Sequence, residues 1–538
     1  MVEPAPRDAS TVDEETAMKR PNFLFFITDQ HRADHLGCAG HPIVKTPNID
    51  AIAAKGVRFD NFNVATPVCM PNRASLLTGR YPSAHGLRYN GCDLSYRAST
   101  FPQALREAGY RTASIGKSHV QPMTEFPAEE RVDPASLGAI KEAWADDGAD
   151  YDNETPGRYR GNAPYPVPTP YYGYDHVDMV TGHGASCDGH YLQWLRAQSP
   201  QADAWRDPAN QLGHSYSCPQ AVRTPIPEDL YPTSFIRDRA VDFLDSVKDD
   251  DRPFFAFVSF PDPHHPFTPP GKYWDMYDPE DFSVRLPYEA HLNPTPPMRW
   301  LHARWQEGKR VAAGQEAFMA SEQELKEAMA LSCGMITMID DAIGVVMEAL
   351  ERTGRKEETI VVFNSDHGDY LGDFNLLLKG AIMLRSINNV SFIWMDPQNR
   401  GAGGVSHALS STVDLAPTIL ERAGVKPYFG IQGKSLLGNL DGSSKLRERL
   451  VVEHQDNMTR MGFSEPCMAR TLLTDGYRLT IYKGEAWGEL YDHARDPDET
   501  HNLWDDAAYA GQRARLVESL TQELLENVDQ SPRARRRA

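Results

Sequence analysis

Apolar and polar residues follow one another along the chain at spacings that predict buried strands separated by helices. Residues 22–28 (NFLFFIT) form a continuous apolar run of strand length that ends at Asp29, which is typical of a strand buried on both faces. Residues 359–365 (TIVVFNS) form a second such run that ends at Asp366. The pattern also predicts strands at 110–116, 253–260 and near 390–395, and helices at 47–56, 101–109, 233–248, 321–352 and 412–423.

Strands and helices therefore alternate over about 400 residues, which predicts an α/β fold with a large mixed sheet flanked by helices. The stretch 121–232, rich in Pro, Tyr, Asp and Gly, is expected to be irregular, either as a surface insertion or as the wall of a binding site. After Gly424, short segments punctuated by Gly and Asp predict an antiparallel meander, followed by a helix at 511–527.

The predicted elements divide the chain into four parts. We expect a disordered leader at 1–20, an α/β catalytic domain at 21–424, a smaller C-terminal α+β domain at 425–530 and a solvated tail at 531–538. A homo-oligomer is also expected, with the C-terminal segment as its interface.

Composition narrows the class of protein. Of the 538 residues, 41% are hydrophobic and 24% are charged, which is ordinary for a globular protein. The net charge of -20 argues against a nucleic-acid-binding surface, although a local basic pocket can still bind an anionic substrate. We find no stretch of the ~20 apolar residues that a membrane helix needs, no secretory signal and too few cysteines for a disulfide framework. We therefore expect a cytoplasmic protein with no nucleic-acid or membrane partner.

Polar residues follow two of the predicted strands directly. Asp29-Gln30 comes after the first apolar run, and Asp366-His367 comes after the run at 359–365. Ligands of open α/β sheets bind at the carboxyl ends of the strands, and oxygen ligands favour hard ions such as Ca²⁺, Mg²⁺ or Mn²⁺. Each pair taken alone is also typical of a helix cap or a turn.

Residues 66–80 (TPVCMPNRASLLTGR) carry the most specific signal. The segments CMPNR (69–73) and LTGR (77–80) resemble the C-x-P-x-R…TGR signature of the sulfatases, formylglycine-dependent hydrolases of the alkaline-phosphatase superfamily. Pro71 suits the first turn of a helix, so Cys69 is expected just before a helix N-terminus, where negative charge is favoured. Arg73 lies one helical turn further on, within reach of position 69. The alternative for Cys69 is a buried structural thiol.

The resemblance extends from about residue 21 to 505 and implies an alkaline-phosphatase-like fold with two cofactors. One is formylglycine, made from Cys69 by a maturation enzyme, which is then a partner. The other is one divalent metal ion, Ca²⁺ or alternatively Mn²⁺. The resemblance implies as metal ligands Asp29, Asp366, His367 and the modified Cys69, with Gln30 standing where many sulfatases have a second metal-binding Asp.

Further site residues follow from shorter matched segments. GKSH (116–119) resembles a GKxH segment in which Lys117 binds sulfate and His119 works with the formylglycine. PHHP (263–266) resembles an H-x-P segment that makes His264 the match and His265 the spacer. Lys379 resembles the second sulfate-binding Lys, and Asn90 resembles a polar residue near the nucleophile in some members. The alternatives are loop lysines, a satisfied polar His119 and a turn-forming Asn90.

The resemblance implies hydrolysis of a small-molecule sulfate monoester, as in arylsulfatases. A hydroxyl of the hydrated aldehyde attacks sulfur, His264 protonates the leaving group and His119 helps to regenerate the aldehyde. The Asp-Gln and Asp-His pairs also resemble choline sulfatases and phosphonate monoester hydrolases, so phosphonate monoester or phosphodiester hydrolysis is the alternative. We favour sulfate because the phosphonate enzymes typically lack the Lys117-x-His119 pair. A non-catalytic sulfatase-like binding protein and a metal-dependent phosphatase are the other classes considered.

The aromatic residues of the irregular stretch have two interpretations. They line an aryl or carbohydrate subsite, or they pack in the protein interior. These residues are Tyr165, Tyr171, Tyr172, Tyr174 and Trp194.

Overall fold

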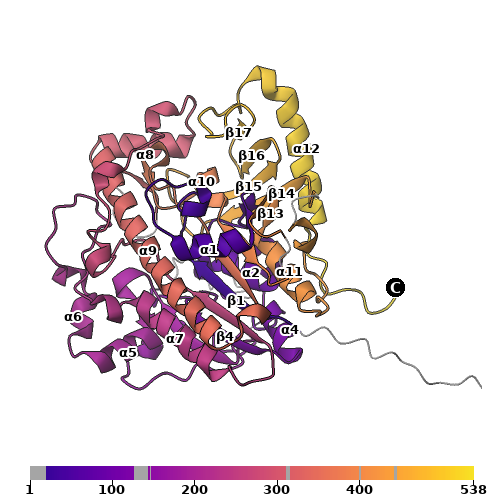
Figure 1. Ribbon diagram of the computed structural model, residues 1–538. Helices are drawn as coiled ribbons and strands as arrows, with labels where there is room; N and C mark the ends of the chain where they lie inside the picture. Colours follow the sequence, from indigo (N-terminus) through magenta and orange to yellow (C-terminus); the bar gives the residue numbers. More distant parts are fainter. Residues whose placement is uncertain are drawn as a thin grey trace, which may run out of the picture.

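The computed structural model describes residues 20–126, 143–145, 147–309, 316–398, 401–440 and 445–537, so nearly all of the predicted leader lies outside it. A nine-stranded mixed sheet forms the centre of the protein, in the order β12-β2-β11-β9-β1-β7-β4-β5-β6. Its strands are β1 (Asn22–Thr28), β2 (Val57–Phe59), β4 (Arg111–Gly116), β5 (His176–Thr181), β6 (Asp188–Gly189), β7 (Phe254–Ser259), β9 (Thr359–Ser365), β11 (Phe392–Met395) and β12 (Gly404–Ser406). Strands β1 and β4 are labelled in Figure 1, with helices around them.

The four central strands β9, β1, β7 and β4 are neighbours and run parallel. Leu24 of β1 pairs with Val361 of β9 on one side and with Ala256 of β7 on the other. Strand β4 continues the parallel set beside β7, whereas β11 pairs antiparallel with β9. The predicted α/β class with a large mixed sheet is therefore confirmed, and the carboxyl ends of four strands share one edge.

Helices cover both faces of this sheet because the side chains of a strand alternate between its faces. One face carries α2 (Cys69–Thr78), α4 (Phe101–Glu107) and α11 (Leu415–Arg422). The other carries α1 (Pro47–Lys55), α5 (His190–Gln198), α7 (Pro232–Ser246) and α9 (Glu322–Arg352). The helices between these elements are α3 (Pro82–His85), α6 (Ala202–Arg206), α8 (Pro296–Gln306) and α10 (Arg385–Asn388).

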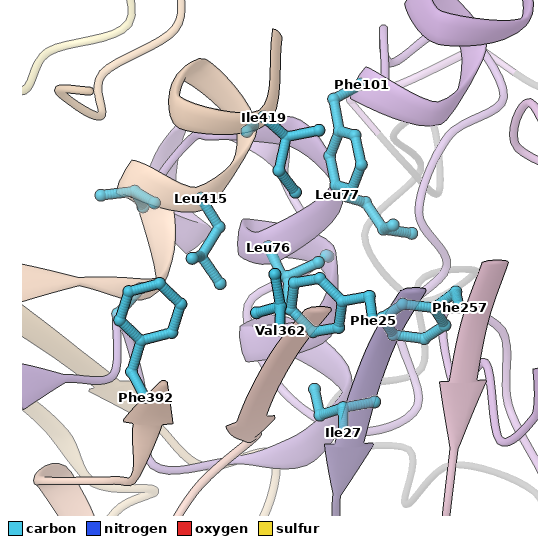
Figure 2. Packing of buried hydrophobic residues seen from close by; sticks show 14 of the residues in the cluster. Phe25, Ile27, Leu76, Leu77, Phe101, Phe257, Val362, Phe392, Leu415 and Ile419 are labelled. Carbon is cyan, nitrogen blue, oxygen red and sulfur yellow. The ribbon is translucent and has the colours of Figure 1, made fainter. Parts of the chain in front are cut away.

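Helix α2 lies between the sheet and the outer helices. Leu76 and Leu77 contact the layer that contains Phe25 and Val362 of the sheet and Leu415 of α11 (Figure 2). All ten residues of α2 are buried, the polar ones included. The helix begins at Cys69 itself, one residue earlier than the sequence predicted, so Pro71 is its third residue.

Helix α9 departs from one prediction. Its length and a mean hydropathy of 1.6 over one window are those of a membrane span, although we found no such stretch in the sequence. However, 78% of that window is buried inside the structure, where Ile339, Ile343 and Val346 pack among the apolar residues beneath the sheet. The apolar composition of α9 is therefore explained by its place in the core.

A second sheet follows near the C-terminus, with the antiparallel order β14-β15-β16-β17 (Figure 1). It contains β14 (Arg449–Gln455), β15 (Met468–Thr474), β16 (Tyr477–Tyr482) and β17 (Gly488–Asp492), and α12 (Ala510–Glu526) packs against it. This confirms the predicted meander and terminal helix. Leu450, Val452 and Leu473 join the same apolar cluster as the central sheet. The domain boundary near 424 stays a prediction.

The stretch 121–232 is more regular than predicted. Strand β5 adds to the central sheet beside β4, and α5 and α6 follow it. Tyr171, Tyr172 and Tyr174 are buried in the main apolar cluster, and Tyr165 and Trp194 pack against such clusters. The three buried tyrosines therefore belong to the interior, as the packing interpretation predicted, whereas Tyr165 and Trp194 are partly buried and a subsite role for them stays a prediction.

Candidate functional site

Polar residues gather where the four central parallel strands end. Asp29 follows β1, Lys117 follows β4, His264 lies beyond β7 and Asp366 follows β9. All four are buried. The shared edge of the sheet brings together residues that are up to 337 positions apart in sequence, as 29 and 366 are.

Cys69 and Arg73 reach this edge from α2, which lies across it. The Arg73 Nε donates to Asp366 Oδ2 at 2.7 Å, and Nη2 lies 3.6 Å from Asp29 Oδ2. Its Nη1 donates to the Lys117 carbonyl and to Ser259 Oγ, each at 2.8 Å. One buried guanidinium of α2 therefore ties together the ends of all four strands, since Ser259 is the last residue of β7.

Four potential metal ligands converge beside Arg73, at the ends of the strands. One ligand atom each from Asp29, Cys69, Asp366 and His367 lies within 4.8 Å of the others. The Nδ1 of His367 is 2.9 Å from the Gly368 carbonyl, which can only accept, so Nδ1 carries the proton of the neutral ring. Its Nε2 lone pair then faces Asp29 Oδ1 at 3.5 Å and Asp366 Oδ1 at 3.7 Å.

This arrangement fits a cation. Neither Asp29 Oδ1 nor His367 Nε2 has a hydrogen-bond partner in the described part of the chain, although both are buried. Burial and Lys379 oppose protonation of His367, but Asp366 and Cys69 outweigh them and raise its pKa. The contact between Nε2 and the two carboxylates therefore needs positive charge, which a proton supplies in the metal-free protein and a metal ion can supply in its place. The residues present therefore match a divalent metal site of mostly oxygen and nitrogen ligands.

Charged neighbours control ionisation here. Burial alone would raise the pKa of Asp29, but Lys117, Arg73 and His367 outweigh it and hold that pKa well below its usual range. Burial also opposes ionisation of Cys69, yet Lys379 brings the pKa of this thiol below its ordinary value. The site therefore stabilises negative charge at both positions.

Two lysines flank Cys69. Lys379 Nζ is 3.5 Å from Cys69 Sγ, 2.8 Å from Gln30 Oε1 and 3.0 Å from His264 Nε2. Lys117 forms a short ion pair with Asp29 and is buried. The structure thus places both predicted lysines in the site, where they can neutralise an anionic group beside position 69.

Histidines form one wall of the site. His264 stacks on His183, with ring centroids 3.6 Å apart, and on His265 at 4.1 Å. The Nδ1 of His264 is 2.5 Å from the His265 carbonyl, so Nε2 faces Lys379. His183 Nε2 is 2.6 Å from Lys117 Nζ. We did not predict His183, because it lies in the stretch read as irregular; its G-H-G context held no strong signal.

A buried carboxylate supports His119. Glu154 accepts hydrogen bonds from the backbone N–H groups of His119 at 2.7 Å, Val120 at 3.0 Å and Gln121 at 3.2 Å. His119 has a φ of 58°, a value that residues other than glycine rarely adopt. Glu154 therefore fixes an unusual turn beside Lys117, and the sequence did not indicate it.

The two remaining predicted residues lie at the edge of the site. The backbone N–H of Gln30 donates to Asp366 Oδ1 at 3.1 Å, while its side-chain amide donates to Asp369 and accepts from Lys379. Gln30 therefore orients a metal ligand through its backbone, and its side chain is engaged elsewhere. Asn90 Oδ1 accepts from the Met70 N–H at 3.3 Å, near the start of α2.

Comparison with known proteins agrees with this site. The profile of the family named Sulfatase matches residues 21–425, and that of the N-sulphoglucosamine sulphohydrolase C-terminal region matches residues 378–527. Uncharacterized sulfatase YidJ of Escherichia coli (strain K12) is 30% identical over 507 residues, which cover 94% of this chain and 87% of the relative. An arylsulfatase of Clostridium perfringens is 28% identical over 513 residues, covering 94% of both chains.

A solved structure leads to the same family. The phosphonate monoester hydrolase of Agrobacterium radiobacter superposes with a TM-score of 0.74 at 26% identity, covering 95% of this chain and 97% of that one. The family profile spans well over half of the chain and contains the strand ends and α2 described above. The chain therefore belongs to the sulfatase family of sulfuric ester hydrolases.

Proposed function

We propose that this protein hydrolyses small-molecule sulfate monoesters of the arylsulfatase type, with formylglycine at position 69 and one divalent metal ion. The observation that carries the proposal is the convergence of Asp29, Cys69, Asp366 and His367 between two buried lysines. The metal ion, which we expect to be Ca²⁺ with Mn²⁺ as the alternative, would be held by those four residues. When present, the metal ion would supply a Lewis acid, and the formylglycine at position 69 would supply an activated hydroxyl nucleophile.

The protein's own side chains then have defined tasks. Lys379 and Lys117 bind the nonbridging oxygens of the sulfate group and offset their charge. His264 takes up a proton from solvent at Nε2, the nitrogen that faces Lys379, and passes it to the leaving oxygen. His119 takes up a proton when the sulfate is released, and Glu154 keeps it in place. Arg73 holds both Asp29 and Asp366 in position.

Phosphonate monoester hydrolysis is a second candidate for the same site. It is supported by the likeness to the Agrobacterium radiobacter enzyme and by a relative from Trinickia caryophylli, described as a multifunctional alkaline phosphatase superfamily protein, that is 29% identical over 514 residues. We favour sulfate because Lys117 and His119 are both present and both buried. A maturation enzyme as partner, a cytoplasmic location and a homo-oligomer belong to the same proposal.

The first experiment joins a mass measurement to a substrate panel. The tryptic peptide that contains residue 69 should be about 18 Da lighter than its thiol form, because aldehyde formation changes the covalent mass. Turnover of an aryl sulfate should follow the modified fraction and exceed turnover of an aryl phosphonate monoester. C69A should be inactive with both. Full activity with an intact thiol would contradict the proposed nucleophile, and a preference for phosphonate would select the second candidate.

A further inference from the structure

A separate group of possible metal ligands lies at the end of the hairpin formed by β14 and β15. The two strands are antiparallel, with Gln455 opposite Met468, and the Asp456 N–H donates to the Cys467 carbonyl at 2.9 Å. His454 and Asp456 are two residues apart, so they point to the same face of the hairpin, and Cys467 lies opposite Asp456. One ligand atom from each of these three residues lies within 4.8 Å of the others.

His454 lacks the partners that a buried imidazole needs. It is 1% exposed, and neither ring nitrogen has a hydrogen-bond partner among the residues that the structure describes. Its Nε2 lies 3.4 Å from Asp456 Oδ2, a contact that is attractive when Nε2 carries a proton or when a cation lies between the two atoms. Leaving a buried polar group unpaired costs on the order of 1–3 kcal/mol, so a cation between the ring and the carboxylate would remove a real penalty.

Cys467 is the third potential ligand. Burial raises the pKa of its thiol, and the carboxylates of Asp456 and Glu489 raise it further. The sulfur is therefore a neutral thiol in the metal-free protein, and a bound metal ion would convert it to a thiolate. A cation would thus pair with the imidazole nitrogen that has no partner, with the carboxylate and with the thiolate together.

We propose that His454, Asp456 and Cys467 form a second metal site, which takes a borderline-soft divalent ion such as Zn²⁺. One nitrogen, one sulfur and one carboxylate oxygen are the donors that Zn²⁺ binds in proteins. The fourth tetrahedral position is left open by these three ligands. The site differs from the one at the strand ends, where two carboxylates favour a harder ion.

The location gives the second site a consequence for the first. His454 and Asp456 line a cavity of about 60 Å³ together with Lys379 and Asn90. The hairpin loop beyond them forms another part of the wall, and its Asn457 donates to the Asn90 carbonyl at 3.1 Å. A metal ion at the base of this loop would fix the wall beside Lys379.

Another group of His and Cys residues does not meet the same conditions. His35, His41 and Cys333 also lie close together. However, His41 Nδ1 accepts the N–H groups of Ile43 and Val44, so the proton of the neutral ring is on Nε2 and no lone pair remains for a metal. The free nitrogens of His454 therefore distinguish the hairpin group.

Cobalt binding to the full chain tests the proposal without interference from the catalytic residue. In C69A, the strand-end site has no sulfur, so a Co²⁺–thiolate absorption band in the near ultraviolet can come only from another cysteine. We expect C69A to bind two equivalents of Co²⁺ and to show this band, which Zn²⁺ should abolish by displacement. Adding C467A should remove the band and one equivalent. The matched control is C218A added to C69A, because Cys218 and Cys467 are both 3% exposed. This control should change neither the thiolate band nor the number of bound equivalents.

The D456N change gives a second measurement that keeps the thiol. It should weaken Co²⁺ binding by more than the roughly 10- to 100-fold that loss of an outer partner costs. One equivalent without a thiolate band in C69A, or a band that survives C467A, would overturn the second site. Neither result bears on sulfate hydrolysis, because every protein in the series lacks Cys69.

Discussion

Replacing Glu154 with Gln tests whether the turn that carries His119 matters for turnover. The buried carboxylate accepts from three consecutive N–H groups, and the Tyr171 hydroxyl donates to it at 2.7 Å. In E154Q the amide oxygen can replace Oε1, which serves the Tyr171 hydroxyl and two of the N–H groups. The amide nitrogen then stands in the place of Oε2 and faces the His119 N–H, so two donors oppose each other.

The expected size of the effect follows from that single lost bond. A hydrogen bond to a charged acceptor is removed and a buried N–H is left unpaired, which costs about 1.5–3 kcal/mol. His119 then leaves its φ of 58°, and a displacement of about 1 Å at a reacting group lowers rates by up to about 100-fold. We expect kcat for an aryl sulfate to fall by about 10- to 100-fold with little change in KM.

Steady-state kinetics and thermal unfolding are measured on the same preparations. Together they distinguish a displacement of His119, which lowers kcat, from a general loss of stability. The matched control is E327Q, because Glu327 is also buried and accepts the N–H groups of Ser217 at 2.8 Å and Cys218 at 2.7 Å. E327Q should keep its kcat and lose less stability, because both N–H groups bond to the same carboxylate oxygen, Oε2, which the amide oxygen can replace. If E154Q is as active as E327Q, Glu154 has no positioning role and the reasoning fails.

Three further predictions concern the contacts of Arg73, the pH dependence of stability and the apolar core. R73K should bind the divalent ion at least ~10-fold more weakly, seen as lower metal content after dialysis, because Lys cannot contact Asp366 and Ser259 together. Burial lowers the pKa of His85 to about 3, so only the unfolded chain takes up this proton between about pH 6.5 and 3. Stability should therefore fall as the pH drops through that range, by up to ~1.4 kcal/mol per unit; an unchanged slope of melting temperature against pH in H85N would contradict this. L76A should cost about 2–5 kcal/mol in thermal or urea unfolding, whereas L525A, at a residue 62% exposed, should cost less than ~0.5 kcal/mol.

Local patterns predicted those elements whose signal lies within a few residues. The apolar runs at 22–28 and 359–365 form β1 and β9, because a strand buried on both faces must be apolar throughout. The segment CMPNR likewise placed Cys69 and Arg73 at the start of a helix. The order of strands in the central sheet was not predicted, since pairing partners such as β9 and β1 are distant in sequence.

The parts of the site that we did not predict depend on contacts between distant segments. His183 enters because β5 joins the sheet beside β4, and the many Pro and Gly residues around this strand concealed it. Glu154 is recognisable only once three N–H groups point at it. His454 looks like any strand residue until its burial and its free ring nitrogens are seen together.

The four strand ends that build the site have a consequence for synthesis of the chain. Asp29 is made early, but its neighbour Asp366 and the flanking Lys379 emerge only about 340 residues later, which at roughly 5–20 residues per second takes tens of seconds. Until then Arg73 has no Asp366 to bind. A chain that ends anywhere before β9 therefore lacks Asp366 and His367 and has no complete metal centre. Complementation by two fragments should restore the site only if β1 of one fragment and β9 of the other are free to pair.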